Sequence, residues 1–531
     1  MNLRAIFYAL GRLLQLMAGT LLVPLVISLA DHRTFNPLRH ADALAFALTI
    51  LLALLAGILL DVTCRRGAGQ QRAREGFAIV ALGWSVLALF GAIPFVVYFL
   101  TTRGPDAAPH LWAAFTHAYF EIMSGFTTTG ATILTDIEIV PRGLLFWRSL
   151  THWLGGMGII TLALAIFPAM GVGGYQMFRG EVPGPTADRL KPRLAETAKI
   201  LWGVYMLLSG VETLLLLLGG MDWFDALCHT FGTMATGGFS TRNASIGAYG
   251  SAYIDWVVTA FMFLAGTNFL LHYRVLFRRD WSSLGANREF RFYAGTIVAA
   301  TLLVSSLLLI GGLPAAELST NNFQATPVSA QTHAAHVDAE ASKVASPAGA
   351  LRHGAFQVVA IVTTTGFGTA DFDVWPRTIG LLLVILMFWG GCAGSTGGGM
   401  KMIRIMVVLK AGWRELRRVT RPRLVAPLKI GGHALPEGMV ANILGFFLLF
   451  IALFVVCSLA MTLFIPDLTT AVASVAATIG NIGPGLSGVG STQNYAWIPD
   501  LGKWVLVLCM LLGRLEVFTV LVLLRPSLWR R

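Results

Sequence analysis

The chain has 531 residues, of which 56% are hydrophobic and only 12% are charged, and its mean hydropathy is +0.70. This composition excludes a soluble globular protein, which needs a charged surface, and predicts a protein embedded in a membrane. The net charge of +12 does not indicate nucleic-acid binding, because the basic residues gather in short loops near 65–74, 179–199, 274–291 and 401–423. Such loops follow the positive-inside rule, so we expect them in the cytoplasm beside anionic membrane lipid.

Ten apolar segments are long enough to cross the hydrocarbon core, which takes about 20 residues in a helix. Four shorter apolar stretches lie between segments three and four, five and six, seven and eight, and nine and ten. The long segments lie near 5–30, 42–61, 76–100, 143–169, 197–219, 252–277, 292–313, 378–409, 438–464 and 501–524, and the short ones near 111–125, 222–235, 351–362 and 468–479. Because irregular backbone at membrane depth must be buried or line a wet cavity, each short stretch is predicted to be a re-entrant half-helix.

Each short stretch ends in a similar tetrapeptide that closes on a glycine. The four are Thr127-Thr128-Thr129-Gly130, Ala235-Thr236-Gly237-Gly238, Thr363-Thr364-Thr365-Gly366 and Gly480-Asn481-Ile482-Gly483. Their final glycines are separated by 108, 128 and 117 residues, which indicates four long repeats. Glycine permits the backbone angles that direct carbonyl oxygens at an ion, and the C-terminal dipole of each half-helix favours a cation. Four such loops around one axis predict a carbonyl-lined cation pathway.

The predicted fold is an all-α polytopic membrane protein. Four helix–pore-loop–helix repeats are expected in a pseudo-fourfold arrangement like that of potassium channels, after an extra N-terminal transmembrane hairpin. We expect the hairpin and its cytoplasmic loop at 1–75 and the repeats at 76–195, 196–289, 290–436 and 437–531. With the basic loops inside, both termini are expected in the cytoplasm, and every glycine loop enters from outside.

The third repeat contains a polar stretch, 321–350, which we expect to be a flexible external insertion. Its His333 and His336, with the nearby His353, are expected to be solvated, because their spacing is too loose for a metal site. Acidic residues follow the first and third glycine loops. They are Asp136, Glu138, Asp371 and Asp373. They could concentrate cations at the outer mouth or be ordinary solvated charges, and the sequence favours neither interpretation.

A glycine-rich stretch interrupts the eighth apolar segment, and so many glycines should break a membrane helix. It reads Gly390-Gly391-Cys392-Ala393-Gly394-Ser395-Thr396-Gly397-Gly398-Gly399-Met400-Lys401. A phosphate-binding loop does not fit, because Lys401 is neither preceded by glycine nor followed by serine or threonine. We predict an unwound segment beneath the third glycine loop that acts as a mobile gate, with Lys401 at its inner end.

Arg514 lies within the last apolar segment, where a charge is costly unless it faces water or a partner. It could form a structural ion pair, for instance with Glu516, or constrict the cation pathway below the glycine loops; we favour the constriction. Lys503, nearer the outer end, is expected to extend its amine toward the membrane surface.

Two other functions have some support in the sequence. Gly485-Leu486-Ser487-Gly488 matches the GxSG pattern of intramembrane serine proteases, but His152 and His272 lie in other repeats without a supporting motif. A proton- or sodium-coupled symporter usually carries carboxylates at the membrane midplane, where Glu212 and Glu516 are the candidates.

The four loops, the stretch from Gly390 to Lys401 and the sequence Gly513-Arg514-Leu515-Glu516 resemble those of the membrane subunit of bacterial Trk potassium-uptake systems. This is the TrkH/TrkG type of the Trk/Ktr/HKT superfamily, and the N-terminal hairpin favours it over the KtrB branch. The resemblance covers the whole chain except 321–350. It implies potassium uptake across the bacterial inner membrane by a transporter, not an enzyme, that is usually a homodimer. It also implies K⁺ as the transported ion, without an organic cofactor in this chain.

The resemblance further implies gating by a cytoplasmic nucleotide-binding ring of the TrkA type, for which the basic loop from Arg404 to Arg423 is suitably placed. It implies that the filter backbone that binds K⁺ is formed by Thr128, Thr129, Gly130, Gly237, Gly238, Thr364, Thr365, Gly366, Asn481, Ile482 and Gly483. The implied gate contains Gly394, Ser395, Thr396, Gly397, Gly398, Gly399 and Lys401. Arg514 corresponds to the arginine that constricts the pore.

Overall fold

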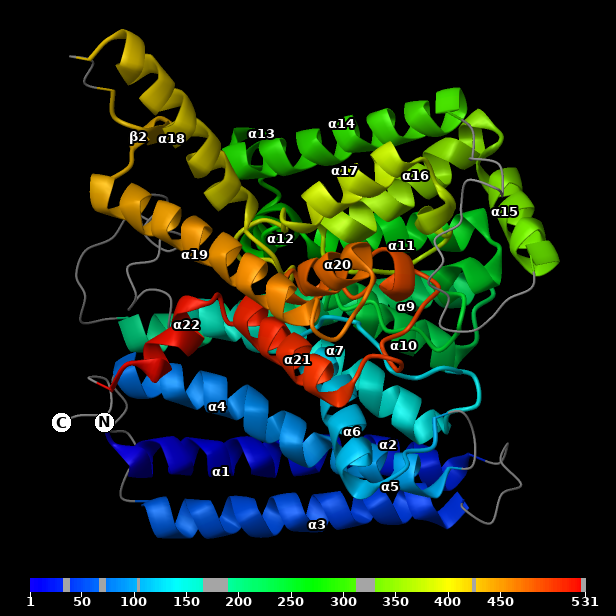
Figure 1. Ribbon diagram of the computed structural model, residues 1–531. Helices are drawn as coiled ribbons and strands as arrows, with labels where there is room; N and C mark the ends of the chain where they lie inside the picture. The colour runs from blue at the N-terminus through cyan, green and yellow to red at the C-terminus, as the bar shows by residue number, and fades with distance from the viewer. Residues whose placement is uncertain are drawn as a thin grey trace.

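The computed structural model describes residues 1–31, 39–65, 73–102, 106–165, 190–311, 330–422 and 426–526. Within these ranges the chain is helical apart from loops and a two-stranded antiparallel hairpin of β1 (Lys429–Ile430) and β2 (His433–Ala434). Helices stack side by side around a centre of shorter helices and loops (Figure 1). This arrangement confirms the predicted all-α polytopic membrane fold.

The N-terminal hairpin consists of α1 (Leu3–Thr20), α2 (Leu22–Ala30) and α3 (Arg39–Cys64). Two glycines allow α1 and α3 to approach closely: a Cβ atom on Gly11 would lie 2.8 Å from the carbonyl oxygen of Gly57. Small residues at such a crossing let helix backbones pack without intervening side chains, as is common in membranes. The hairpin lies along one edge of the molecule, beside α4 (Figure 1).

Each of the four repeats places a short helix between two longer helical segments. Repeat 1 has α4 (Ala73–Gly91), α5 (Ile93–Thr101), α6 (Leu111–Phe126) and α7 (Arg142–Ala165). Repeat 2 has α9 (Leu190–Leu218), α10 (Trp223–Met234), 3₁₀ helix η4 (Ser245–Tyr249), α11 (Ala252–Ala265), α12 (Phe269–Arg278) and α13 (Ser282–Ala286). Repeat 3 has α14 (Arg288–Gly311), α15 (Ala330–Val344), α16 (Pro347–Val362), η5 (Phe372–Val374), α17 (Arg377–Met387) and α18 (Met402–Thr420). Repeat 4 has α19 (Glu437–Met461), α20 (Leu468–Ile479), η6 (Ser487–Val489), α21 (Asp500–Arg514), α22 (Phe518–Leu521) and η7 (Val522–Leu524).

All ten predicted crossings coincide with helices, but their lengths differ. Six described helices are long and apolar enough to cross a membrane, and two bent pairs raise the number to eight. The pair α11–α12 bends by 103° and the pair α21–α22 by 109°. Helix α17 has only 11 residues before the glycine-rich loop, so the eighth predicted crossing is two helices joined by irregular backbone.

The four half-helices α6, α10, α16 and α20 have 12 to 16 residues, about 18–24 Å at 1.5 Å per residue, so they do not span the hydrocarbon. Side chains fix where three of them begin. His110 Nδ1 accepts the Ala113 amide, Ser346 Oγ accepts the Gly349 amide, and Asp467 accepts the amides of Thr469 and Thr470. These caps satisfy donors that would otherwise be unpaired at each helix start.

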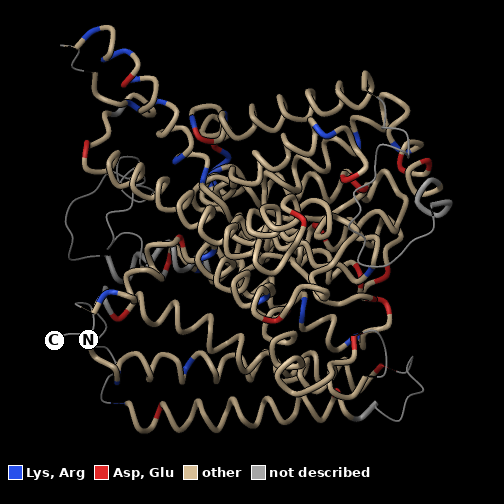
Figure 2. Tube along the Cα trace, in the orientation of Figure 1, with Lys and Arg blue, Asp and Glu red and all other residues tan. Residues whose placement is uncertain are grey.

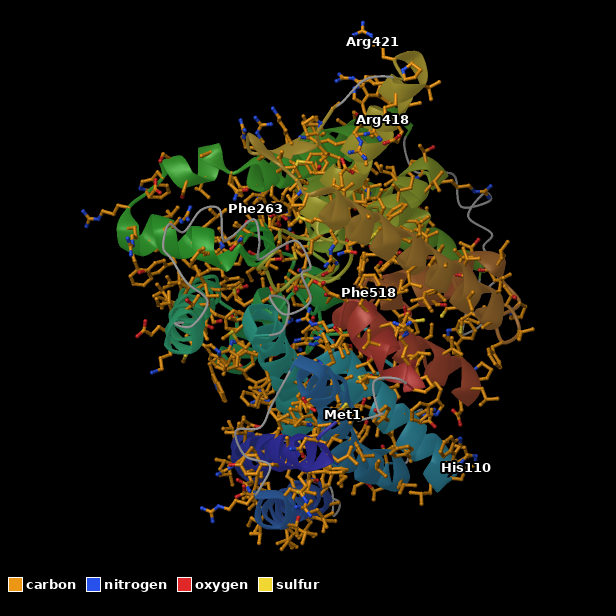
Figure 3. The ribbon with its side chains drawn as sticks, turned by 90° about the vertical axis from the view of Figure 1, so that its left-hand side faces the viewer. Met1, His110, Phe263, Arg418, Arg421 and Phe518 are labelled. Atoms are coloured by element: carbon orange, nitrogen blue, oxygen red, sulfur yellow. The ribbon has the colours of Figure 1, made fainter. Side chains whose placement is uncertain are left out.

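Most charged residues lie toward the ends of the molecule, and a few lie in its interior (Figure 2). Helix α18 projects from the body, and its Arg418 and Arg421 point outward at its far end (Figure 3). The beginning of α1 and helix α22 lie at the same end of the molecule (Figure 1).

The expectation of a flexible insertion at 321–350 is wrong for its described part, and residues 321–329, with the His333 side chain, lie outside the described set. Residues 330–344 form α15, which packs on α16 and is anchored through three side chains. His336 Nε2 donates to Asp371 Oδ2 at 3.0 Å, Glu340 Oε2 accepts the Asp371 amide, and Lys343 Nζ donates to the Thr369 carbonyl. A polar sequence forms an ordered helix here because its charged side chains bind the loop that follows the third glycine.

The contact between His336 and Asp371 makes the attachment of α15 depend on pH. The hydrogen bond that His336 donates to Asp371 raises the pKa of His336 above its ordinary value of 6.5, helped by the charges of Asp371 and Glu340 and opposed by partial burial and Lys343. A raised pKa means that the stabilisation is complete below about pH 6.5 and is lost as pH rises through the folded-state value.

We expect amide exchange in α15 to be slower in the wild type than in His336→Gln at about pH 5.5, with the difference shrinking by about pH 8.5. Comparing both proteins at each pH removes the intrinsic pH dependence of exchange. An equal difference at both pH values would contradict the role of the imidazolium.

Candidate functional site

The four glycine loops share one backbone conformation. The second residue of each tetrapeptide, two positions before the glycine, is left-handed, and the final glycine also has a positive φ. The φ angles are 50° and 80° for Thr128 and Gly130, 55° and 80° for Thr236 and Gly238, 61° and 75° for Thr364 and Gly366, and 55° and 99° for Asn481 and Gly483. Non-glycine residues seldom adopt positive φ. Its occurrence at the same position of all four tetrapeptides shows that the four loops have the same backbone conformation.

Each loop closes its half-helix with the same two hydrogen bonds. In repeat 1, the Thr128 amide donates to the Gly125 carbonyl at 3.0 Å and the Thr129 amide to the Ser124 carbonyl at 2.9 Å. The corresponding bonds recur in the other three repeats. They satisfy the last carbonyls of the half-helix, as in other left-handed helix caps, and leave the following peptide units free to turn.

The loops meet in a closed ring. A Cβ atom on Gly130 would collide with the Gly237 carbonyl oxygen, one on Gly238 with Thr365, and one on Gly366 with Ile482. A Cβ atom on Gly483 would lie 2.7 Å from the Thr129 carbonyl oxygen, which returns the chain of contacts to repeat 1. Each glycine therefore packs against the peptide oxygen of the next loop, and only residues without a side chain fit. The structure thus brings all the predicted loop residues together.

A cavity of about 110 Å³ lies at the ring, lined by its four glycines. The residues that follow the glycines form its wall, among them Ala131, Ser240, Gly368 and Pro484. Arg148 and Arg242 also line this cavity. The features that suit a cation, carbonyl oxygens and the C-terminal dipoles of the half-helices, therefore belong to the ring of loops rather than to the cavity wall. No group of three or more histidine, cysteine or acidic side chains suited to a metal occurs in the described residues.

Polar residues that sequence reasoning missed support the ring from behind. Each half-helix carries a buried polar residue nine positions before its glycine, namely Glu121, His229, Gln357 and Ser474. Glu121 accepts from the Thr132 hydroxyl and the Ile133 amide, both at 2.9 Å, and His229 Nε2 lies 2.9 Å from Ser240 Oγ. Gln357 donates to the Ala370 carbonyl, whereas Ser474 bonds only within its own helix. Aligning the four repeats on their glycines would have revealed this polar position.

Arg148 from α7 joins the first two repeats behind the ring. Its Nε lies 2.5 Å from Glu121 Oε1, its Nη1 donates to the Ser240 carbonyl at 2.9 Å, and its guanidinium lies 3.6 Å from the Phe239 ring centroid. Arg148 and Glu121 are both almost fully buried. The pair therefore connects the segments that follow the glycines of repeats 1 and 2, because Glu121 binds the first segment and Arg148 binds the second.

The glycine-rich stretch is an irregular hairpin between α17 and α18, as predicted. The Gly390 amide donates to the Met400 carbonyl at 2.8 Å, and the Met400 amide to Phe388 at 3.3 Å. The hairpin touches the backbone at the ends of the half-helices: the Gly398 amide donates to Thr364 Oγ1 at 2.6 Å, and Thr396 Oγ1 donates to the Met234 carbonyl at 3.0 Å. We call residues 388–401 the intramembrane loop; it lies against repeats 2 and 3 on the half-helix side of the ring.

Arg514 contacts this loop and does not pair with Glu516. Its Nη1 donates to the Thr396 carbonyl at 2.7 Å and its Nη2 to the Gly155 carbonyl of α7 at 3.1 Å. Glu516 pairs instead with Arg404, so the structural ion pair considered for Arg514 is wrong. Lys401 Nζ donates to the Gly397 carbonyl within the loop. Two cationic side chains thus bind carbonyls of the intramembrane loop.

Other sequence-based expectations are corrected. Lys503 is buried and its Nζ lies 2.8 Å from His117 Nε2, so its amine does not extend to the membrane surface. Asp371 is buried and accepts from Ser491 and Thr492, so it is not a solvated loop charge, and the half-buried Asp373 accepts the Ser487 amide.

Asp136 and Glu138 are the more exposed members of that acidic group, and they contact Asn243. His353 is buried and its Nδ1 lies 3.0 Å from Thr369 Oγ1, so it is not solvated, whereas His336 is 41% exposed and also bonded to Asp371.

The GxSG motif does not form a catalytic site. The Ser487 hydroxyl donates to Asp467 at 3.0 Å. His152 Nδ1 binds the Gly125 carbonyl and His272 Nε2 the Leu264 carbonyl. Neither histidine can act as the general base that a serine nucleophile requires.

We expect Arg148→Met to lower the free energy of unfolding by about 3–5 kcal/mol, because it leaves the Glu121 carboxylate buried without its counter-charge. The double variant with Glu121→Met should be more stable than the single variant, without full recovery, because Thr132 and Ile133 lose their acceptor. Thermal unfolding in detergent measures both. A double variant less stable than Arg148→Met would contradict the pairing.

Comparison with known proteins assigns the family. The sequence model described as "TrkH: Cation transport protein" matches residues 43–531. The chain is 39% identical to the Trk system potassium uptake protein TrkH of Halomonas elongata over 100% of both chains, and 30% identical to TrkG of Escherichia coli over 100% of this chain and 99% of that protein. The crystal structure of the potassium transporter TrkH from Vibrio parahaemolyticus superimposes with a TM-score of 0.82 at 36% identity, covering 100% of both chains. The chain belongs to the TrkH family of cation transport proteins, and it is a multi-pass membrane protein and not an enzyme.

Proposed function

We propose that this protein takes up potassium ions across the bacterial inner membrane through the ring of glycine loops. The closed contact of the four glycines carries the proposal, because it places equivalent peptide units from four repeats around one cavity. Carbonyl oxygens so arranged can replace the hydration shell of K⁺. The relatives named as potassium uptake proteins support the choice of ion.

The filter residues in this proposal are the eleven named from the sequence, from Thr128 to Gly483. Carbonyl oxygens act as ligands, and the buried side chains behind them keep the loops in place. One glycine per loop gives a short filter, so discrimination between potassium and sodium is expected to be incomplete.

The proposed gate is the intramembrane loop, with Arg514 as the constriction. The loop touches the backbone of repeats 2 and 3 directly, and Arg514 links it to Gly155 of repeat 1. A cation leaving the ring would therefore meet the loop and a buried positive charge, and both must be displaced or screened for flow.

The proposed assembly is a homodimer regulated by a cytoplasmic nucleotide-binding ring of the TrkA type. Helix α18 offers a suitable surface for that ring, because it projects from the body (Figure 3) and carries Arg417 and Arg418 in its last turn. The beginning of α1 and helix α22 lie at the same end of the molecule as α18 (Figure 1), which fits a cytoplasmic orientation of that end.

A coupled symporter remains the second candidate, favoured by Glu212 of α9. Both of its carboxylate oxygens are buried without a hydrogen-bond partner in the described chain, since the nearby Thr233 hydroxyl donates to the His229 carbonyl. A buried carboxylate of this kind could carry a proton. Unchanged uptake in Glu212→Gln across external pH would exclude that role.

The filter is tested by ⁸⁶Rb⁺ uptake in cells that lack their own potassium-uptake systems. Gly366→Ala should reduce uptake at least about tenfold, because its φ is +75° and its Cβ would collide with the Ile482 carbonyl. Gly366→Asp should abolish uptake. Gly295→Ala in α14, where a Cβ meets nothing within 4 Å, is the matched control and should transport like the wild type. Normal uptake by Gly366→Ala at equal membrane level would refute the filter.

Arg514→Ala should raise the maximal rate of uptake about tenfold or less, because it removes a positive charge and two loop contacts. Arg377→Ala, at an exposed arginine that begins α17, is the control. A rate equal to that of the wild type would show that Arg514 has a purely structural role. It would not contradict the proposed filter.

A further inference from the structure

The intramembrane loop is also held by the chain that joins α11 to α12 in repeat 2. The Cys392 amide donates to the Gly266 carbonyl at 2.8 Å, where α11 ends. The Phe269 amide, at the start of α12, donates to the Gly394 carbonyl at 3.1 Å. The bend between α11 and α12 is therefore bonded to the loop in both directions.

Glu289, in the first turn of α14, binds the loop more strongly. Its Oε1 accepts the Ala393 amide at 2.7 Å and the Ile403 amide at 3.1 Å. These two donors lie on opposite sides of the loop's turn, so one carboxylate oxygen fastens the entering strand to the start of α18. The side chain is 9% exposed, and a charged acceptor makes stronger hydrogen bonds than a neutral one.

Glu289 and Phe269 are the two ends of one short segment. The segment contains α12, with Arg274 and Arg278, then Arg279 and the short helix α13, and these three arginines belong to the third basic stretch. Both ends of the segment thus hold neighbouring residues of the loop, 393 and 394. A displacement of the segment would pull on the loop at both anchors.

We infer that Glu289 is a positioning residue that keeps the intramembrane loop closed, and that the segment from Phe269 to Glu289 transmits movements from the cytoplasmic side to the loop. This inference rests on the proposed function, in which the loop is the gate. Glu289 does not contact the ion; it acts by fixing the loop's ends.

Two substitutions separate this role from a general structural one. Glu289→Ala leaves two buried amides without an acceptor, which favours conformations in which the loop leaves its site. Glu289→Gln retains an amide oxygen at the same place and can still accept from Ala393 and Ile403. Glu437→Ala is the matched control, since Glu437 also lies in the first turn of a long helix, α19, but is exposed and pairs with Arg414.

The experiment measures ⁸⁶Rb⁺ uptake in the cells described above, as maximal rate, KM and preference for Rb⁺ over Na⁺. We expect Glu289→Ala to raise the maximal rate at least about fivefold, with KM and ion preference unchanged. One unpaired buried donor already produces a population shift of that size, and the substitution leaves two. Glu289→Gln and Glu437→Ala should match the wild type. Equal rates for Glu289→Ala and wild type, or an equal rise in Glu437→Ala, would overturn the inference while the filter stands.

A second measurement covers the case in which Glu289→Ala transports poorly. Cys392 lies in the loop and is 1% exposed, so its modification by a thiol reagent in inside-out vesicles, in a Cys64→Ser background, reports opening of the loop. Modification should be faster in Glu289→Ala than in the wild type and Glu289→Gln. Equal rates in all three would overturn the inference, and a wild type without Rb⁺ uptake would overturn the proposed function together with it.

Discussion

The contact of each glycine with the peptide oxygen of the next loop is the constraint on which the rest of the structure depends. No side chain fits at Gly130, Gly238 or Gly366, so four half-helices can converge only if each ends in this residue. Convergence in turn requires the half-helices to stop inside the membrane, where their last carbonyls need partners. The left-handed residue two positions before each glycine supplies those partners by turning its own amide back into the helix.

The residues behind the ring differ from repeat to repeat although the loops do not. Repeat 1 uses a buried carboxylate paired with Arg148, repeat 2 uses His229, and repeat 3 uses Gln357. Each of these side chains forms a hydrogen bond with the segment that follows the glycine of its own repeat. The four repeats are therefore alike in their backbone at the ring and differ in the side chains around it. The intramembrane loop and Arg514 are features of single repeats and add to this asymmetry.

Much of this architecture follows from the sequence. Span length and the recurrence of a final glycine predicted the four repeats, because membrane thickness and the backbone angles of glycine restrict what such a pattern can form. The break at Gly390 to Lys401 followed from glycine content alone. The partners of single charged groups did not follow: Arg514 was considered with Glu516, its near neighbour, but binds Thr396 and Gly155 from distant parts of the chain. Helix α15 was also missed, because it buries few apolar side chains, among them Val337 and Val344, and its attachment also depends on contacts of His336 and Glu340 with Asp371.

The most direct test of the central claim is anomalous diffraction from crystals of the protein grown in Rb⁺ or Tl⁺. The account predicts a peak inside the ring, among the carbonyl oxygens of residues such as Thr129, Gly237, Thr365 and Ile482, that disappears when the ion is replaced by a large organic cation. Anomalous density that is absent from the ring and present elsewhere in the membrane region would show that ions take another route.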